Sequence, residues 1–146
     1  MQRSSSIIIT AALLFGLSTV LGAANARSAD LTLTVDNIES VEGTLNWVLY
    51  DTEENYRDND AAVFSARAKV SGETMRFTVH ALPPGRYAIK LFHDANANGE
   101  LDSNALGLPT EGYGFSNNAG RFGPPDFEDA SFELGDTPVK VQVRVR

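Results

Sequence analysis

Strict alternation of apolar and polar residues is the feature that most limits the folds open to this chain. It is clearest from Pro138 to Arg146, where four valines alternate with Lys, Gln and Arg residues. Successive side chains of a β-strand point to opposite faces, so this pattern predicts a strand with one buried face. The same pattern predicts strands at 31–36, 44–50, 73–80, 86–92 and 130–134.

One-sided strands pair into antiparallel sheets, and two such sheets bury their apolar faces by packing together. The short turn Ala81–Gly85 joins two alternating segments and predicts that they form an antiparallel pair. We therefore expect an all-β antiparallel β-sandwich with one long loop between its late strands, and a closed barrel is the main alternative. Because the chain has no cysteine, disulfides cannot stabilise it.

The segment 52–71 has the least regular pattern. It begins with polar residues, and 61–68 then predicts either a short helix anchored by Val63 and Phe64 or an irregular excursion between strands. No apolar period decides between these two interpretations.

The first 26 residues have the organisation of a secretory signal peptide. Arg3 is their only charge, 7–22 is apolar apart from small and hydroxyl residues, and Ala24 and Ala26 suit a cleavage site. A retained membrane anchor is the alternative, but the apolar run is shorter than the roughly 20 residues of a span. We expect 27–146 to be a single periplasmic or secreted domain, with no transmembrane segment in the mature protein.

The chain is acidic, with 12 Lys and Arg residues against 19 Asp and Glu residues and a net charge of −7. Binding to nucleic acid needs clustered positive charge, so we expect no nucleic-acid partner. An acidic protein suits a medium that contains divalent cations.

The longest stretch without a strand or helix pattern runs from His93 to Asp129. It is rich in glycine and proline, and it carries four aromatic residues. Connections of this length are usually functional or disordered, and the aromatic rings would be costly to leave in water. We therefore expect this stretch to be ordered.

The start of this stretch matches the first nine positions of an EF-hand-type calcium loop. Asp94, Asn96 and Asn98 would donate side-chain oxygens from positions 1, 3 and 5, with glycine at position 6. Glu100 would donate its backbone carbonyl, and Asp102 would bind directly or through water. The spacing therefore predicts a calcium site.

The loop departs from the EF-hand pattern in two ways. Ala105 replaces the bidentate Glu of position 12, and a strand rather than a helix leads into the loop. A ligand from further along would complete the site, and the candidates are Glu111, Asp126, Glu128 and Asp129. We expect weak affinity, of about 10⁻⁴ to 10⁻³ M, as in extracellular modules. The alternative is an Asn- and Gly-rich turn that holds no ion.

The two histidines, His80 and His93, give little basis for catalysis or for a zinc site. No Ser nucleophile motif, Cys, HExxH motif or recognisable carboxylate pair accompanies them. We interpret His93 as a hydrogen-bonded structural residue at a strand end, and we assign no catalytic residue.

The second half of the long stretch is rich in aromatic residues. Tyr113, Phe115, Asn117 and Phe122 could line a ligand groove, because aromatic residues together with Asn are a common composition for sugar recognition. The alternative, which we favour, is a loop that packs its own aromatic residues onto the sandwich edge.

Several longer motifs are distinctive in combination: GTLNWVLYD at 43–51, LPPGRYA at 82–88, FHDANANGELD at 92–102, PTEGYGFSNN at 109–118 and GPPDFEDASF at 123–132. On these motifs the chain resembles an uncharacterised bacterial family catalogued as domain of unknown function 2141. The resemblance covers nearly the whole of 27–146. It implies an exported protein with a prealbumin-like, or transthyretin-like, β-sandwich, and it brings no established activity.

These features together predict an exported, non-enzymatic β-sandwich with a calcium-stabilised loop, acting in binding or structure at the cell envelope. Its partner would be an envelope protein or a glycan. One alternative is an envelope enzyme or carbohydrate-binding accessory that uses the 111–127 loop. Another is an adaptor that binds proteins through a free edge strand such as 138–146.

Overall fold

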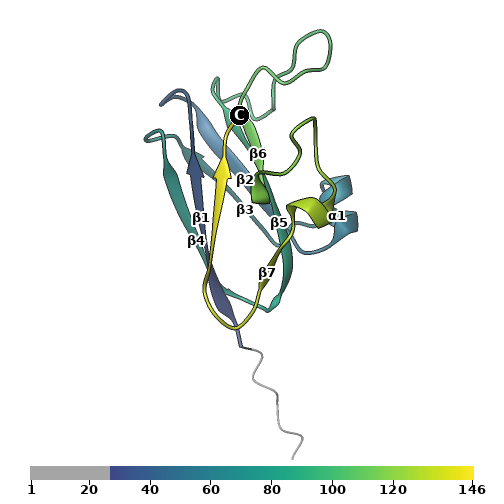
Figure 1. The fold of residues 1–146 in the computed structure, drawn as a ribbon. Helices are drawn as coiled ribbons and strands as arrows, with labels where there is room; N and C mark the ends of the chain where they lie inside the picture. Colours follow the sequence, from purple (N-terminus) through teal and green to yellow (C-terminus); the bar gives the residue numbers. More distant parts are fainter. Residues whose placement is uncertain (1–26) are drawn as a thin grey trace, which may run out of the picture.

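The computed structural model describes residues 27–146, which form two β-sheets packed face to face (Figure 1). The predicted signal peptide at 1–26 lies outside the described residues. The smaller sheet has the strand order β4-β1-β8, and the larger has the order β3-β2-β5-β6, with β7 also paired to β5. The strands are β1 (Ala29–Asp36), β2 (Thr44–Tyr50), β3 (Phe64–Lys69), β4 (Met75–Leu82), β5 (Gly85–Asp94), β6 (Tyr113–Phe115), β7 (Phe132–Leu134) and β8 (Val139–Arg144).

The expected all-β sandwich is confirmed. Alternate side chains of each strand point into the core and toward the surface. Leu33 of β1, Trp47 of β2 and Ile89 of β5 are at most 1% exposed and belong to one buried cluster that both sheets supply. Full burial of side chains of this size contributes about 1.5–3 kcal/mol each. Within 27–146, β3 and β4 end their sheets without pairing to each other, so the sheets do not close into a barrel.

Segment 61–68 is neither of the two structures that the sequence left open. β3 occupies its residues 64–68 and pairs antiparallel with β2, whereas helix α1 (Glu53–Asp58) lies earlier and is capped by the Thr52 hydroxyl. Phe64 does not anchor a helix; its ring lies tilted against that of Trp47, with the ring centroids 5.1 Å apart. The strand was not evident because the inward residues that follow Phe64 are Ala66 and Ala68, which are too small to give a clear apolar period.

The expected antiparallel pair between 73–80 and 86–92 is wrong. The turn at Pro83 and Pro84 carries the chain from one sheet to the other, so β4 pairs with β1 and β5 pairs with β2. The Tyr87 hydroxyl donates a hydrogen bond to the Pro83 carbonyl at 2.8 Å and fixes this crossing. A short turn therefore joins two layers here rather than two neighbours in one sheet.

β8 pairs with β1 in parallel, which is the exception to antiparallel pairing among the described strands. Its register places Val141 beside Leu33 and Val143 beside Val35. The chain enters β8 from β7, which belongs to the other layer, through a turn at Gly135 and Asp136.

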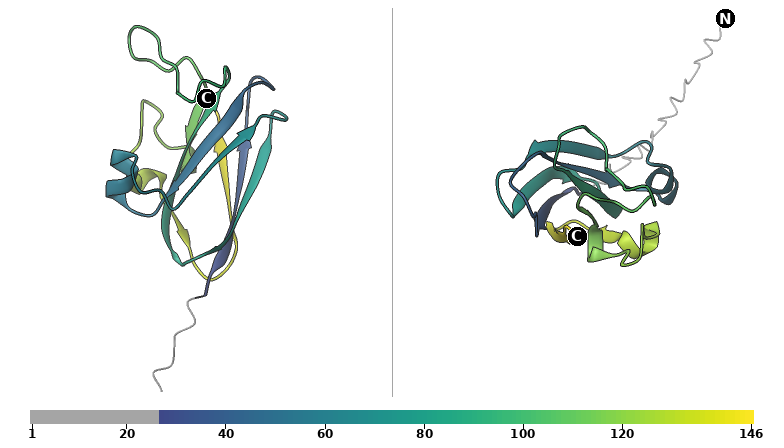
Figure 2. Two further views of the ribbon diagram at one scale, coloured as in Figure 1. Left: turned by 180° about the vertical axis from the view of Figure 1, so that it is seen from behind. Right: turned by 90° about the horizontal axis from the view of Figure 1, so that it is seen from above.

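The 93–129 stretch was expected to lack secondary structure, and this is wrong. It contains the end of β5, strand β6, the 3₁₀ turn η1 (Ser116–Asn118) and most of helix α2 (Phe127–Ala130). β6 joins the two sheets along one side, because Tyr113 and Arg146 exchange backbone hydrogen bonds of 3.1 and 3.0 Å (Figure 2). A Cβ at Gly114 would lie 2.8 Å from a methyl of Val143, so glycine is needed for this approach.

No helix of the described part, 27–146, has both the length and the apolar character to cross a membrane.

Gly43 provides a test of how tightly the β1–β2 turn packs under the end of β5. Its φ is +66°, and a Cβ there would lie 2.0 Å from the Asp94 carbonyl oxygen. We expect Gly43→Ala to destabilise the fold by about 2–4 kcal/mol or more, because both φ and the close contact exclude a side chain. Gly135→Ala, which meets nothing within 4 Å, should cost less than about 0.5 kcal/mol. Urea unfolding followed by Trp47 fluorescence measures both, and equal effects would contradict the packing.

Candidate functional site

A groove of about 860 Å³ lies on the outer face of the larger sheet. Its rim is formed by the end of α1 and by two loops, 101–109 and 121–124, which stand beyond the sheet in Figures 1 and 2. Its floor consists of the outward side chains of three adjacent strands: Asn46, Val48 and Tyr50 of β2, Lys90 and Phe92 of β5, and Tyr113 and Phe115 of β6.

Strand register explains how these side chains come together. Residues that are paired across neighbouring strands point to the same face of a sheet. Phe92 pairs with Asn46 on one side and with Tyr113 on the other, which gives one row across the floor. Lys90 pairs in the same way with Val48 and Phe115 and gives a second row.

Three of the four predicted ligand-binding residues line this groove. Tyr113 and Phe115 lie on the floor, and Phe122 stands at the rim with 96% of its surface exposed. Asn117 has a different role: its amide donates to the carbonyls of Asp129 and Ser131 at 3.1 and 2.7 Å. Asn117 therefore holds η1 to the end of α2 and does not line the groove.

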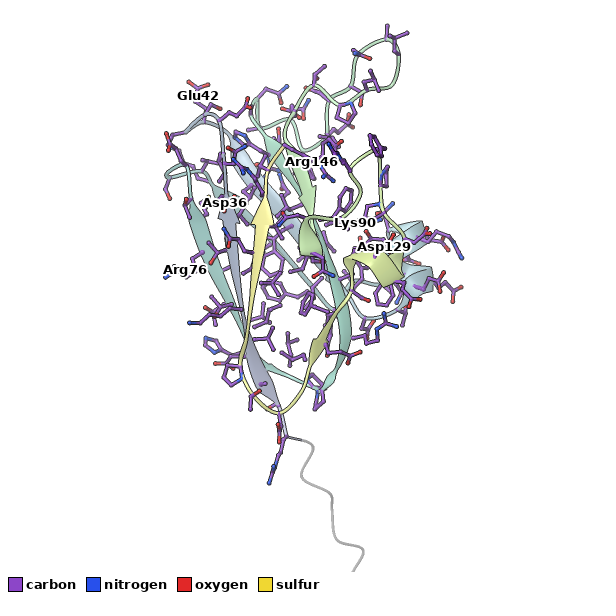
Figure 3. All side chains as sticks on the ribbon, in the orientation of Figure 1. Asp36, Glu42, Arg76, Lys90, Asp129 and Arg146 are labelled. Atoms are coloured by element: carbon purple, nitrogen blue, oxygen red, sulfur yellow. The ribbon has the colours of Figure 1, made fainter. Side chains whose placement is uncertain are left out.

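Lys90 is the charged group of the floor (Figure 3). Its ammonium donates to the Tyr56 carbonyl at 2.5 Å and to the Asn59 side-chain oxygen at 2.9 Å, and it lies 4.1 Å from the centroid of the Tyr56 ring. Burial lowers the pKa of Lys90 by disfavouring the charged form. Burial also raises the pKa of neighbouring Tyr50, with a further contribution from the charge of Asp60.

Sequence reasoning missed Asn46, Tyr50, Lys90 and Arg121 as groove residues. One signal could have found the floor: β2 carries Val48 and Tyr50 on the face opposite its core residues, and β5 likewise carries Phe92. A strand that is apolar on both faces has a second face to cover or to use in binding.

The predicted calcium loop forms a tight turn around the carboxylate of Asp94, which is fully buried. One oxygen accepts the N–H of Asn98 at 3.0 Å, and the other accepts the N–H of Gly99 at 2.8 Å. The second oxygen also accepts the Arg67 guanidinium at 3.2 Å and, at 3.4 Å, the hydroxyl of Thr44. The position-1 side chain therefore organises the turn, with an arginine as its charge partner.

Oxygen donors of the remaining predicted ligands also gather in this turn. The amides of Asn96 and Asn98 both donate to the Asp102 carboxylate, at 2.6 and 3.1 Å. The N–H of Glu100 donates to the Asn98 side-chain oxygen at 2.9 Å. Within 27–146, no three Asp, Glu, His or Cys side chains group closely enough to hold a metal ion, so Asn and backbone oxygens would have to contribute.

Glu111 is the candidate twelfth-position ligand that returns to this loop. Its two carboxylate oxygens accept the N–H groups of Ala95 and Asp102, at 2.9 and 3.0 Å, and so hold both ends of the turn. The other candidates, Asp126, Glu128 and Asp129, belong to α2 or its N-cap, and α2 packs against α1 and η1.

Neither histidine lines the groove. His93 is 4% exposed, and its Nε2 lies 2.8 Å from the Glu42 carbonyl oxygen. His80 is exposed on the smaller sheet, with its Nδ1 2.9 Å from the Asp30 carboxylate. That carboxylate has a lowered pKa because it accepts hydrogen bonds from the Ala81 N–H and from His80.

Glu111→Gln tests whether the carboxylate holds the loop by its two hydrogen bonds. The substitution replaces one acceptor by an NH₂ group that faces a backbone N–H, so we expect a loss of about 1–3 kcal/mol. Hydrogen exchange at the Ala95 and Asp102 amides should accelerate, and urea unfolding measures the free energy. Glu128→Gln, an exposed change on α2, is the control. Unchanged exchange at both amides would contradict the role of Glu111.

The model of a family described as "Uncharacterized protein conserved in bacteria (DUF2141)" matches residues 33–142. No curated protein and no solved structure gives a significant match. The matched range runs from β1 to β8 and includes the groove, the Asp94 turn and Glu111. The chain therefore belongs to this uncharacterised bacterial family.

Proposed function

We propose that this protein is a non-enzymatic binding module that takes its ligand into the groove of the larger sheet. The observation that carries the proposal is the convergence of aromatic and apolar side chains from β2, β5, β6 and two loops on one open groove. Large apolar surface that remains open to water in a folded protein marks an interaction site. Phe122, almost wholly exposed at the rim, is the clearest case.

The module would act at the cell envelope, either in the periplasm or after secretion. This part of the proposal rests on the signal-peptide pattern of 1–26. The positions of the two histidines agree with a binding role rather than a catalytic one. The His93 ring is engaged by the Glu42 carbonyl, and His80 lies on the other sheet, away from the groove.

Calcium would order the 94–102 turn, which leads into the rim loop 101–109. The donor set of Asp94, Asn96, Asn98, Asp102 and Glu111 supplies oxygens, as a hard cation requires. Binding would replace the Arg67 contact with Asp94, and half-turns of the two Asn amides would present oxygen where nitrogen now donates. Loss of these contacts agrees with weak affinity.

A carbohydrate is the second candidate ligand, either bound alone or in support of an envelope enzyme. The aromatic rings of Tyr113, Phe115 and Phe122 favour it, because an exposed ring offers a flat apolar face to a sugar. A glycan array with the purified protein distinguishes this candidate, and loss of any glycan signal in Phe122→Ala would assign it to the groove.

The groove itself is tested with the neutral fluorescent probe N-phenyl-1-naphthylamine. We expect binding by the unmodified protein and about tenfold or greater weakening in Phe122→Ala, because a large apolar contact contributes about 1.5–3 kcal/mol. Leu106→Ala is the matched control, since Leu106 is exposed but does not line the groove. Equal affinities in the two variants would place the probe elsewhere.

Thermal unfolding in millimolar calcium, compared with a chelator, tests the ion. We expect an increase of several degrees in melting temperature, because ligand at ten times its Kd stabilises by about 1.4 kcal/mol. Asp102→Asn should reduce this increase, whereas Asp129→Asn, on α2, should keep it. An unchanged melting temperature in calcium would contradict the ion site and would show that the turn is held by its own hydrogen bonds alone.

A further inference from the structure

We propose that the groove binds a single-chain amphipathic carboxylate of the fatty-acid type, with its apolar chain over the aromatic floor and its head group at Lys90 and Arg121. This inference rests on the proposed binding function and names the chemistry of the ligand. The volume of about 860 Å³ lies within the range of roughly 300–1,000 Å³ that is usual for small-molecule sites.

Charge is the first argument. Lys90 and Arg121 are the charged residues that line the groove, and both are positive in a chain of net charge −7. Within 27–146, neither has an Asp or Glu oxygen within 4 Å, although four other arginines pair with carboxylates. Asp60 and Asp126 are close enough to raise the pKa of Tyr50 and of Tyr56 respectively, but neither lines the groove or pairs with Lys90 or Arg121. The unneutralised positive charge therefore complements an anion.

The hydrogen-bonding capacity of Lys90 is the second argument. An ammonium has three donor hydrogens, and the Tyr56 carbonyl and the Asn59 side chain accept two of them. Among the described residues no acceptor takes the third, and Lys90 lines the groove where a ligand oxygen could take it. The lowered pKa of Lys90 reflects burial that no anion offsets, so a bound carboxylate would stabilise the charged form.

The third argument is the apolar character of the remaining surface. Phe92, Tyr113 and Phe115 form a continuous part of the floor, while Leu108 and Phe122 stand largely exposed at the rim. A hydrocarbon chain on this floor would cover the partly exposed rings of Phe92 and Tyr113 and the exposed side chains of Leu108 and Phe122, and burial of apolar surface favours binding. Neutral polar side chains are few in the lining, chiefly Asn46 and Asn59, which favours a chain over a sugar with many hydroxyls.

The test compares ligands that differ only in the head group. Oleate and oleyl alcohol, both below the concentration at which they aggregate, compete with N-phenyl-1-naphthylamine for the purified protein. We expect oleate to displace the probe at a concentration at least tenfold lower than the alcohol. Arg121→Gln and Lys90→Met should each reduce this ratio, whereas Arg76→Gln, an exposed arginine on β4 of the other sheet, should keep it.

The ratio of the two displacing concentrations distinguishes lost head-group binding from a disturbed fold. Loss of the Lys90 contacts with α1 would weaken the binding of oleate and of the alcohol equally and leave the ratio unchanged. Equal displacement by oleate and alcohol in the unmodified protein would overturn the carboxylate inference while leaving the binding function intact. Failure of the probe and both competitors to bind would overturn the binding function itself. A preference for oleate that survives both Lys90→Met and Arg121→Gln would overturn the assignment of these two residues.

Discussion

The buried carboxylate of Asp94 is the constraint on which the functional side of the molecule depends. A charge without exposure to water must be paired and fully hydrogen-bonded, and loss of a partner in such a site costs about 3–5 kcal/mol. Arg67 of β3 and Thr44 of β2 supply partners from the sheet, and two loop N–H groups supply the rest. The chain is therefore forced to turn sharply as it leaves β5. Glu111 then holds both ends of the excursion, so that the 101–109 loop stands at the rim of the groove.

β6 connects the 95–112 loop to the rest of the fold. Its alternate residues face β8 on one side and the groove on the other. Gly112 and Gly114 face β8, where any side chain would collide with Val145 or Val143. Tyr113 and Phe115 alternate with them and face outward onto the groove floor. Close packing of the two sheets and the outward position of the two aromatic rings are thus two consequences of one alternation. The larger sheet consequently has two apolar faces: one lies in the core, and the other is partly covered by α1 and α2 and partly open at the groove.

Much of the fold could be predicted because large apolar side chains repeat at every second residue in β1, β2, β4, β5 and β8. β3 escaped because two of its three inward side chains, after Phe64, are only Ala, and β6 escaped because its inward position is Gly114, which leaves no apolar signal. The sharp turn after Asp94 was predictable from the spacing of its Asp, Asn and Gly residues. The sequence offered Glu111 only as one of several residues that could hold this turn, because a contact across 16 residues leaves no local pattern.

The sequence by itself determined the class of fold, the position of the turn after Asp94 and the membership in a bacterial family, since each depends on residues close together along the chain. Tertiary structure alone decided that β4 and β5 enter different sheets, that β8 runs parallel to β1, and that the groove exists at all. The groove joins residues from Asn46 to Pro124 through the register of three strands. Register is set by the packing of the whole core, so no local segment encodes which side chains become neighbours.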